Sequence, residues 1–276
     1  MKRPALVALV TLLIAVLACG GPSPQAATAQ AMSEALNATQ TALASSVKPG
    51  NAVETAEAQA TAVAQSAAAT EAIAAATQAI EQAATASAVA PMLNELPQYG
   101  VDPAQGKPGW AHPPVTIDLT GYQQYDYATQ FSGTVARSFV VTADITWNTF
   151  TGLSGCGFAF RADDKGNQYL LIATRGGNGH IVFVTMADNE VKDHKDFYAL
   201  PLDINNDATN HLAVVGQGTL FTFYTNGVQA GQVDTNAKTG PTANIRYDAG
   251  FVALVALSES GRTVCQFDRG WLWLIN

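Results

Sequence analysis

Apolar residues follow three different patterns along this 276-residue chain. They form one continuous run from Ala5 to Leu17, recur at helical intervals between Ala26 and Ala90, and alternate with polar residues beyond Pro97. These patterns are typical of a signal or membrane segment, of a helix and of β-strands, respectively. The chain therefore divides into an N-terminal leader, a helical or unstructured middle segment and a β-rich C-terminal part.

The alternating part contains at least eight segments rich in β-branched and aromatic residues, which predict strands. The segments are 138–147, 157–162, 167–174, 180–186, 210–217, 219–225, 250–257 and 263–275. Glycines and asparagines between them, as in 175–179 and 225–227, supply the positive φ angles of tight hairpin turns. No segment of this part predicts a helix. We expect an all-β fold in which two antiparallel sheets form a sandwich.

The segment 26–90 consists mainly of Ala, Thr, Gln and Ser and has no aromatic residue, so it cannot bury enough apolar surface to fold as a domain. Alanine and glutamine favour helices, whereas Lys48-Pro49-Gly50-Asn51 interrupts the pattern. We expect two helical pieces that act as a stalk. Two alternatives stay open: an alanine-rich coiled coil that makes the protein oligomeric, and a monomeric stalk that is frayed or a disordered linker.

The first 25 residues predict an exported and anchored protein. Two basic residues precede an apolar run that is shorter than the roughly 20 residues of a membrane-spanning helix. The run ends in Val16-Leu17-Ala18-Cys19-Gly20, which resembles the lipobox of bacterial lipoproteins, where the cysteine is acylated and becomes the N-terminus. The resemblance implies removal of the signal peptide 1–18, a lipidated linker 19–25 that begins at Cys19, and attachment to the outer face of a bacterial membrane at the cell surface. The alternative is an ordinary secretory signal with an incidental cysteine.

Charge excludes one class of partner. The chain has 14 basic and 22 acidic residues and a net charge of −8. Such a chain has no electrostatic basis for holding a phosphate backbone. We therefore expect no nucleic-acid partner.

Three stretches of the alternating part carry a family resemblance. They are CGFAFRADDKGNQYLLIAT (156–174), HLAVVGQGTLFTFYTNGVQAGQVDT (211–235) and GFVALVALSESGRTVCQFDRGWLWL (250–274). They resemble the concanavalin A-like lectin/glucanase jelly rolls, in the branch that includes laminin-G-like domains, and the resemblance covers residues 115–276. It implies a curved antiparallel sandwich whose concave sheet often holds carbohydrate. We expect residues 91–114 to be a linker that precedes this sandwich.

A sugar site needs an aromatic platform beside charged or bidentate hydrogen-bonding groups. The candidates in the resembling stretches are Arg161, Tyr169, Arg175, Asp268, Arg269 and Trp271, with Trp147 and Trp273 as further platforms. Each has a structural alternative. Arg161 can cap a sheet edge, and Trp147 and one of the other two tryptophans can lie in the core, because residues two apart share a face of a strand.

Catalysis is not expected. A glycosidase of this fold would carry a Glu-x-Asp-x-x-Glu strand, which places two carboxylates on one face at catalytic separation. The glutamates available to the head are Glu95, Glu190 and Glu259, and they do not form this motif. Asp193 and Asp196 fall in a charged segment that we interpret as a solvated loop.

The four histidines show no zinc-ligand spacing. Asp203, Asn205 and Asp207 place three oxygen-bearing side chains at alternate positions, which makes them weak candidates for calcium; the alternative is a polar turn before a strand. No other cofactor is expected.

Cys156 and Cys265 remain after the lipidated cysteine, and an even pair in an exported protein favours a disulfide. Two buried free thiols are the alternative. A disulfide would close a loop of more than 100 residues, which is worth about 4–5 kcal/mol on the chain-entropy model.

The sequence thus predicts a membrane-anchored surface lipoprotein whose head binds carbohydrate or glycan without catalysis. Two alternatives stay open, a protein-interaction or adhesion module and a divergent glycoside hydrolase. A concave groove filled with aliphatic side chains would argue against carbohydrate.

Overall fold

The structure is a computed structural model that describes residues 67, 70–71, 73–78, 85–198, 201–237 and 242–276. Cys19, the segments 1–18 and 19–25, and most of 26–90 lie outside the described residues. The described residues of 26–90 are helical. The chain divides into two units, 1–82 and 83–276. Among the described residues, no helix has the length and apolar character needed to cross a membrane.

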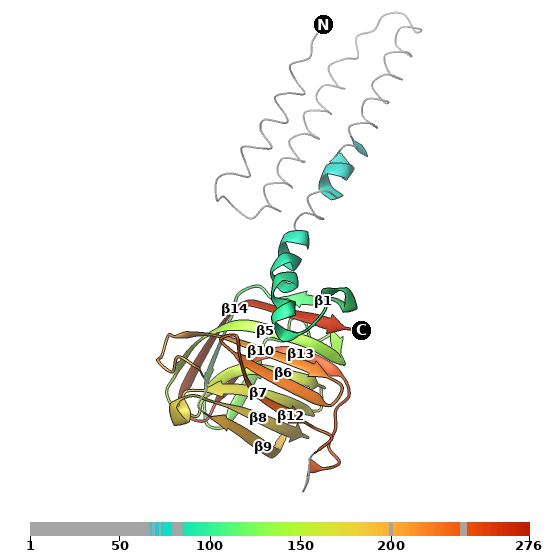
Figure 1. The fold of residues 1–276 in the computed structure, drawn as a ribbon. Helices are drawn as coiled ribbons and strands as arrows, with labels where there is room; N and C mark the ends of the chain where they lie inside the picture. The colour runs from blue at the N-terminus through green and yellow to red at the C-terminus, as the bar shows by residue number, and fades with distance from the viewer. Residues whose placement is uncertain (1–66, 68–69, 72, 79–84, 199–200, 238–241) are drawn as a thin grey trace, which may run out of the picture. The chain divides into compact units, whose positions relative to one another are not determined.

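Two antiparallel sheets make up the second unit (Figure 1). The first, sheet A, has the order β1-β14-β5-β10-β11-β12, and β2 also pairs with β14. Its strands are β1 (Gly106–Ala111), β2 (Val115–Thr120), β5 (Ser138–Thr149), β10 (Thr209–Gln217), β11 (Leu220–Thr225), β12 (Val228–Asp234) and β14 (Arg262–Ile275).

The second, sheet B, has the order β3-β13-β6-β7-β8-β9, and β4 also pairs with β13. Its strands are β3 (Gln124–Tyr127), β4 (Val135–Ala136), β6 (Gly155–Ala162), β7 (Gln168–Thr174), β8 (His180–Ala187), β9 (Glu190–Tyr198) and β13 (Gly250–Ser258). The chain crosses between the sheets at β2–β3, β4–β5, β5–β6, β9–β10, β12–β13 and β13–β14. The predicted all-β antiparallel jelly-roll sandwich is confirmed, and all eight predicted strands are present.

The core lies between the two sheets because alternate residues of each central strand point inward. Trp147 is fully buried there, which confirms the structural alternative given for it. Sheet B contributes Phe160, Tyr169 and Phe183, and sheet A contributes Phe221; the rings of all four lie within 6.0 Å of one another, centroid to centroid. This aromatic cluster fixes the spacing of the two sheets.

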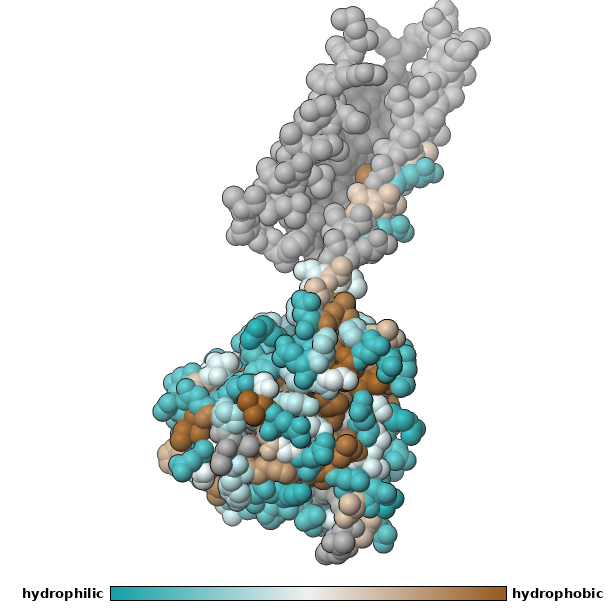
Figure 2. All heavy atoms as spheres, in the orientation of Figure 1, coloured by the Kyte–Doolittle hydropathy of each residue, from teal (hydrophilic) through white to brown (hydrophobic). Residues whose placement is uncertain are grey.

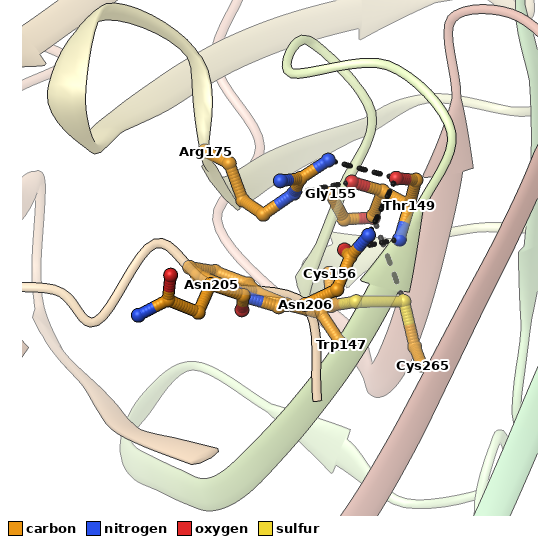
Figure 3. Close-up of a disulfide and its surroundings, with 8 residues drawn as sticks. All are labelled: Trp147, Thr149, Gly155, Cys156, Arg175, Asn205, Asn206 and Cys265. Carbon is orange, nitrogen blue, oxygen red and sulfur yellow. Dashed lines mark hydrogen bonds between the residues drawn. A yellow bond between two sulfur atoms is a disulfide. The ribbon is translucent and has the colours of Figure 1, made fainter. Parts of the chain in front are cut away.

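A disulfide between Cys156 and Cys265 joins β6 of sheet B to β14 of sheet A, with the two Cα atoms 5.8 Å apart (Figure 3). Both cysteines are fully buried. The pairing that the sequence favours is therefore present, and it ties the first half of the sandwich to its closing strand.

The segment expected as a linker, 91–114, is folded instead. Residues 85–95 are helical and continue into the 3₁₀ turn η1 (Leu96–Tyr99), a second turn η2 (Pro103–Gln105) and β1, which pairs with β14. The apolar residues Met92, Leu96 and Tyr99 follow helical spacing and are buried with Val101 against sheet A. The folded head therefore begins well before residue 115.

The charged segment around Asp193, His194 and Asp196 is also different from the prediction. It is not a loop but the edge strand β9, paired along its length with β8. Most of its side chains are exposed, so the sequence lacks the apolar alternation by which a strand is recognised. Its backbone nevertheless pairs with β8.

Candidate functional site

Arg161 is not available to a ligand. Its side chain is 3% exposed and donates to the carbonyl oxygens of Tyr247 (2.8 Å), Arg137 (2.9 Å) and Gly218. Its guanidinium also lies 4.7 Å from the centre of the Phe221 ring. Burial lowers the pKa of Arg161 from its ordinary value. The guanidinium therefore closes one end of the sandwich from inside, so the prediction that it contacts a sugar is wrong.

Tyr169 is also an interior residue. It is fully buried among the aromatic side chains of the core, and its hydroxyl accepts a hydrogen bond from the backbone N–H of Tyr247 at 3.2 Å. Its place on β7 directs the ring toward sheet A. Tyr169 is therefore part of the core and not a platform for a ligand.

Trp271 and Trp273 share a face of β14, as predicted, but this is the outer face of sheet A. Both are less than 5% exposed because residues 85–101 pack over them. The same residues also cover the neighbouring side chains of Val140 and Val215. The indole N–H of Trp271 donates to Glu95 of the covering segment at 3.2 Å. Neither tryptophan presents a free aromatic surface.

Arg269 and Asp268 lie beside this covered face. Asp268 is exposed, and it is the cross-strand neighbour of Asp144 on β5. Arg269 sits at a bulge with φ +50° and turns its guanidinium onto Asp144, with Nε 2.5 Å from Oδ2. Asp144 in turn accepts from His211. The structure thus gathers three of the predicted residues, Asp268, Arg269 and Trp271, but Arg269 and Trp271 are engaged within the protein.

Arg175 lies at the opposite end of the strands from Arg161, among the turns 121–123, 150–154, 175–179, 202–207 and 259–261. We call this the disulfide end, because Cys156 and Cys265 lie beneath it. Arg175 donates to the hydroxyl and the carbonyl of Thr149, each at 2.8 Å (Figure 3). It also donates to the carbonyl of Ile204. It joins two loops and only part of its side chain reaches the surface.

The candidate calcium residues are engaged in the same loop. Asp203 accepts from the backbone and side-chain nitrogens of Asn205, and Asp207 accepts from Asn148 at 2.9 Å. The Asn205 carbonyl accepts from the indole N–H of Trp147 at 2.9 Å. Within the described residues, no group of three His, Cys, Asp or Glu side chains has the arrangement of a metal site. Calcium binding here stays a prediction.

The outer faces of the sheets do not form the aromatic and charged groove that the resemblance implies. Residues 85–101 cover the part of sheet A that carries Trp271 and Trp273. The outer face of sheet B carries aliphatic side chains, Leu170, Ile172, Val184 and Val255, with Tyr125 and Tyr127 packed against them. The two tyrosine hydroxyls donate to Asn189 and Gln168. An aliphatic face of this kind argues against a sugar site on sheet B.

Exposed apolar side chains gather instead at the disulfide end. We define the apolar row as Tyr122, Phe150, Leu153 and Tyr198, whose exposed fractions are 68%, 77%, 58% and 60%. Figure 2 shows hydrophobic surface at the left end of the head, where the yellow turn η3 (Gly176–Asn178) lies in Figure 1.

Contacts between turns connect the members of the row. The turn that carries Tyr122 bonds to the β13–β14 turn through Gly121 N–H and the Gly261 carbonyl, at 2.9 Å. Three glycines of these turns lie next to side chains of the row. A Cβ atom placed on Gly261 would overlap the Phe150 ring. A Cβ atom on Gly176 would lie 3.3 Å from Leu153, and one on Gly177 would lie 3.4 Å from Tyr198. Tyr122 and Phe150 therefore lie on turns that meet at Gly261, and Leu153 and Tyr198 lie beside successive glycines of the turn 175–179.

Polar groups border the row at its Tyr198 end. The ring of Tyr198 stacks on His180 with 5.1 Å between centroids, and His180 Nε2 lies 4.0 Å from Asp196. The glycines Gly176 and Gly177 leave the backbone between Leu153 and Tyr198 uncovered, because they carry no side chain. The row thus offers aromatic rings with hydrogen-bonding groups beside them.

The apolar row is not among the sites predicted from the sequence. A signal for two of its members was present, since Phe150 and Leu153 lie in the turn-forming stretch Thr149–Gly155, where no strand alternation would bury them. The cluster of Glu95, Asp144 and His211 carries no such signal, because its members are far apart in the sequence and only the fold brings them together.

Comparison with known proteins gives similar architectures at low identity. No family model and no curated protein matches the sequence. The carbohydrate-binding module CBM66 of Bacillus subtilis is 14% identical, over 61% of this chain and 94% of that one, with a TM-score of 0.43. A β-glucanase of Bacillus licheniformis is 11% identical, over 58% and 78%, with a TM-score of 0.41. The sialidase module CBM40 of Ruminococcus gnavus, bound to α2,6-sialyllactose, is 14% identical, over 59% and 93%, with a TM-score of 0.36. Likenesses of this size do not indicate what this chain binds.

Proposed function

We propose that the head is a non-catalytic carbohydrate-binding module and that its ligand lies along the apolar row. The observation that carries this proposal is the exposure of three aromatic rings, Tyr122, Phe150 and Tyr198, on neighbouring turns at one end of the sandwich. Sugars present flat faces of C–H groups that stack on such rings, while their hydroxyls bond to polar groups at the rim.

The proposed binding involves no reaction. Glu95 and Asp144 both bond to the imidazole of His211 on the covered face of sheet A, so this pair of carboxylates does not face the row. Hydrolysis of a bound glycan would contradict the proposal and favour a divergent glycoside hydrolase.

A binding experiment with matched variants tests the proposal. Phe150→Ala and Tyr198→Ala should each weaken binding to a glycan selected on an array, by roughly tenfold, because a stacked ring contributes about 1–1.5 kcal/mol. Val135→Ala, a substitution of an equally exposed apolar residue on β4 at the other end, should leave affinity unchanged. Thermal unfolding should be the same for all three. An array without ligands, or ring variants that bind as tightly as the unmodified chain, would show the proposal to be wrong.

A protein ligand is the second candidate, and Leu153 is the observation that favours it. An aliphatic side chain adds apolar contact area but offers no plane for a sugar to stack on. If a protein is the ligand, Leu153→Ala should weaken binding as much as Phe150→Ala.

We further propose that the mature chain begins at an acylated Cys19, which would hold the head at the outer face of a bacterial membrane. The proposal rests on the Leu-Ala-Cys-Gly sequence at the end of the apolar run. Two or three acyl chains give stable attachment, because each buried methylene contributes about 0.8 kcal/mol.

A further inference from the structure

One charged cluster fastens the N-terminal segment 85–101 to the outer face of sheet A. His211 on β10 lies between two carboxylates: its Nδ1 is 2.8 Å from Asp144 Oδ1 on β5, and its Nε2 is 2.6 Å from Glu95 Oε1 at the end of the helix. Arg269 on β14 completes the cluster by donating to the other oxygen of Asp144. We call Glu95, Asp144, His211 and Arg269 the His211 clamp.

The geometry of the clamp requires a particular protonation state. A carboxylate only accepts hydrogen bonds, and a neutral imidazole has a single N–H. Both contacts of His211 can be hydrogen bonds to carboxylates only if both ring nitrogens carry protons. The protonated ring and Arg269 then balance the charges of Glu95 and Asp144, which is the condition for burying such a group.

Two other groups that face the clamp donate to Glu95, and the exposed carboxylate of Asp268 lies across the strand from Asp144. The hydroxyl of Tyr99 donates to Glu95 Oε1 at 2.5 Å and lies 3.1 Å from His211 Nε2, and the indole of Trp271 donates to Glu95 Oε2. Tyr224 on β11 packs against the Tyr99 ring. Neither tyrosine hydroxyl loses its proton near neutral pH. Within the described residues, His211 is therefore the group of the cluster whose charge changes near neutral pH.

We propose that the His211 clamp makes the docking of residues 85–101 on sheet A depend on pH. A proton on His211 links Glu95 of the segment to Asp144 of the sheet. Loss of that proton breaks one of the two links and leaves a nitrogen lone pair facing a carboxylate. Docking then depends on the apolar contacts of Met92, Leu96, Tyr99 and Val101, on the Trp271–Glu95 hydrogen bond and on the one link that the neutral imidazole keeps.

The directions in which the pKa values of His211 and Glu95 are shifted define the pH range in which docking is tight. Burial alone would lower the pKa of His211, but its bonds to Glu95 and Asp144 outweigh burial and raise the pKa above 6.5. Burial alone would raise the pKa of Glu95, but bonds from His211, Tyr99 and Trp271 lower it below 4.5.

The contribution of His211 is therefore complete below pH 6.5 and is lost as the pH rises through its raised pKa. That of Glu95 is complete above pH 4.5 and is lost as the pH falls through its lowered pKa. Docking is tightest between pH 4.5 and 6.5. Above that window the docking constant falls by up to about tenfold per pH unit, until the raised pKa of His211 is passed.

Two measurements on the full-length chain test this proposal. NMR of ¹³C-labelled histidine rings should show that His211 titrates above 6.5, and Glu95→Gln should lower that value. Acrylamide quenching of tryptophan fluorescence reports docking, because the segment covers Trp271 and Trp273. Quenching should increase between about pH 6 and pH 9 in the unmodified chain and should be high at both values in His211→Gln.

His194→Gln is the matched control. His194 lies on the edge strand β9, its side chain is 61% exposed, and its Nε2 lies 3.9 Å from Asp196, so it does not take part in the clamp. This variant should keep the pH dependence of the unmodified chain. A His211→Gln chain that keeps this dependence would overturn the proposal. If that variant does not fold, the titration of His211 in the unmodified chain decides, and a value at or below 6.5 overturns the proposal.

Discussion

At the scale of single residues, the polar side chains that look suited to a ligand mostly satisfy the protein itself. Arg161, which is buried, donates to main-chain carbonyls, and Arg175 donates to a threonine hydroxyl and to main-chain carbonyls. Arg269, whose side chain is 77% exposed, donates to the carboxylate of Asp144. A buried cation is stable only with such partners. Alternation along a strand shows that a residue lies on one of two faces, but it does not show whether that face is solvated.

Arg161 allows a direct test of this internal role. Arg161→Ala should destabilise the head by about 3 kcal/mol, because it removes a buried side chain that donates to three main-chain carbonyls and packs against Phe221. Chemical denaturation measures the change. Arg262→Ala is the control, since Arg262 pairs with Asp118 on the surface and its loss should have little effect. Equal effects of the two substitutions would contradict the role assigned to Arg161.

At the scale of secondary-structure elements, residues 85–101 belong to the folded head and not to a linker. The helix buries one face on sheet A and exposes the other. Leu96 is fully buried, whereas Leu93 on the same turn is 40% exposed.

Identical substitutions at these two leucines test the boundary of the head. Leu96→Ala should lower the free energy of unfolding by about 2–4 kcal/mol, because it removes a buried side chain and leaves a cavity. Leu93→Ala should change it by less than about 0.5 kcal/mol, as expected for a surface position. Thermal unfolding of both variants provides the measurement. A head whose stability does not respond to Leu96→Ala would place the boundary after the helix.

The disulfide gives a second prediction at this scale. Replacing Cys156 and Cys265 together by alanine should cost about 4 kcal/mol, because the bond spans 109 residues of sequence and restricts the unfolded chain. Both cysteines are fully buried, so a reducing agent should act on the folded protein slowly. Unfolding in the presence and absence of reductant measures the loss. A double variant as stable as the unmodified chain would show that the cross-link adds no stability.

The strands differ in whether the sequence pattern is sufficient to predict them. The central strands β5, β6, β7, β10 and β13 are predictable because both of their faces are covered and apolar residues fill them. The edge strand β9 is not, because its charged side chains point to solvent and leave no apolar period. The burial of Trp271 is not predictable either, since it depends on a segment more than 170 residues away along the chain that covers the outer face of sheet A.

At the scale of the whole molecule, the residues before and after Pro97 differ in composition. All aromatic residues lie after Pro97, and the described head uses them both in its core and in the apolar row. The segment 26–90 has none, which leaves it without the means to form such a core. Under the functions proposed above, the head would carry the recognition surface and residues 1–25 would determine the location of the protein.

Substitution of Cys19 tests that location. Cys19→Ser should move the protein from the membrane fraction to the soluble fraction, because a serine cannot be acylated through sulfur and the short apolar run 5–17 is too short to span a bilayer. Ser23→Ala, four residues further along, should leave the protein in the membrane fraction. Incorporation of labelled palmitate, followed by washing of the membranes with salt and carbonate, provides the measurement. If the unmodified protein washes off in plain buffer, or carries no label, the proposed anchor is wrong and an ordinary secretory signal accounts for the N-terminus.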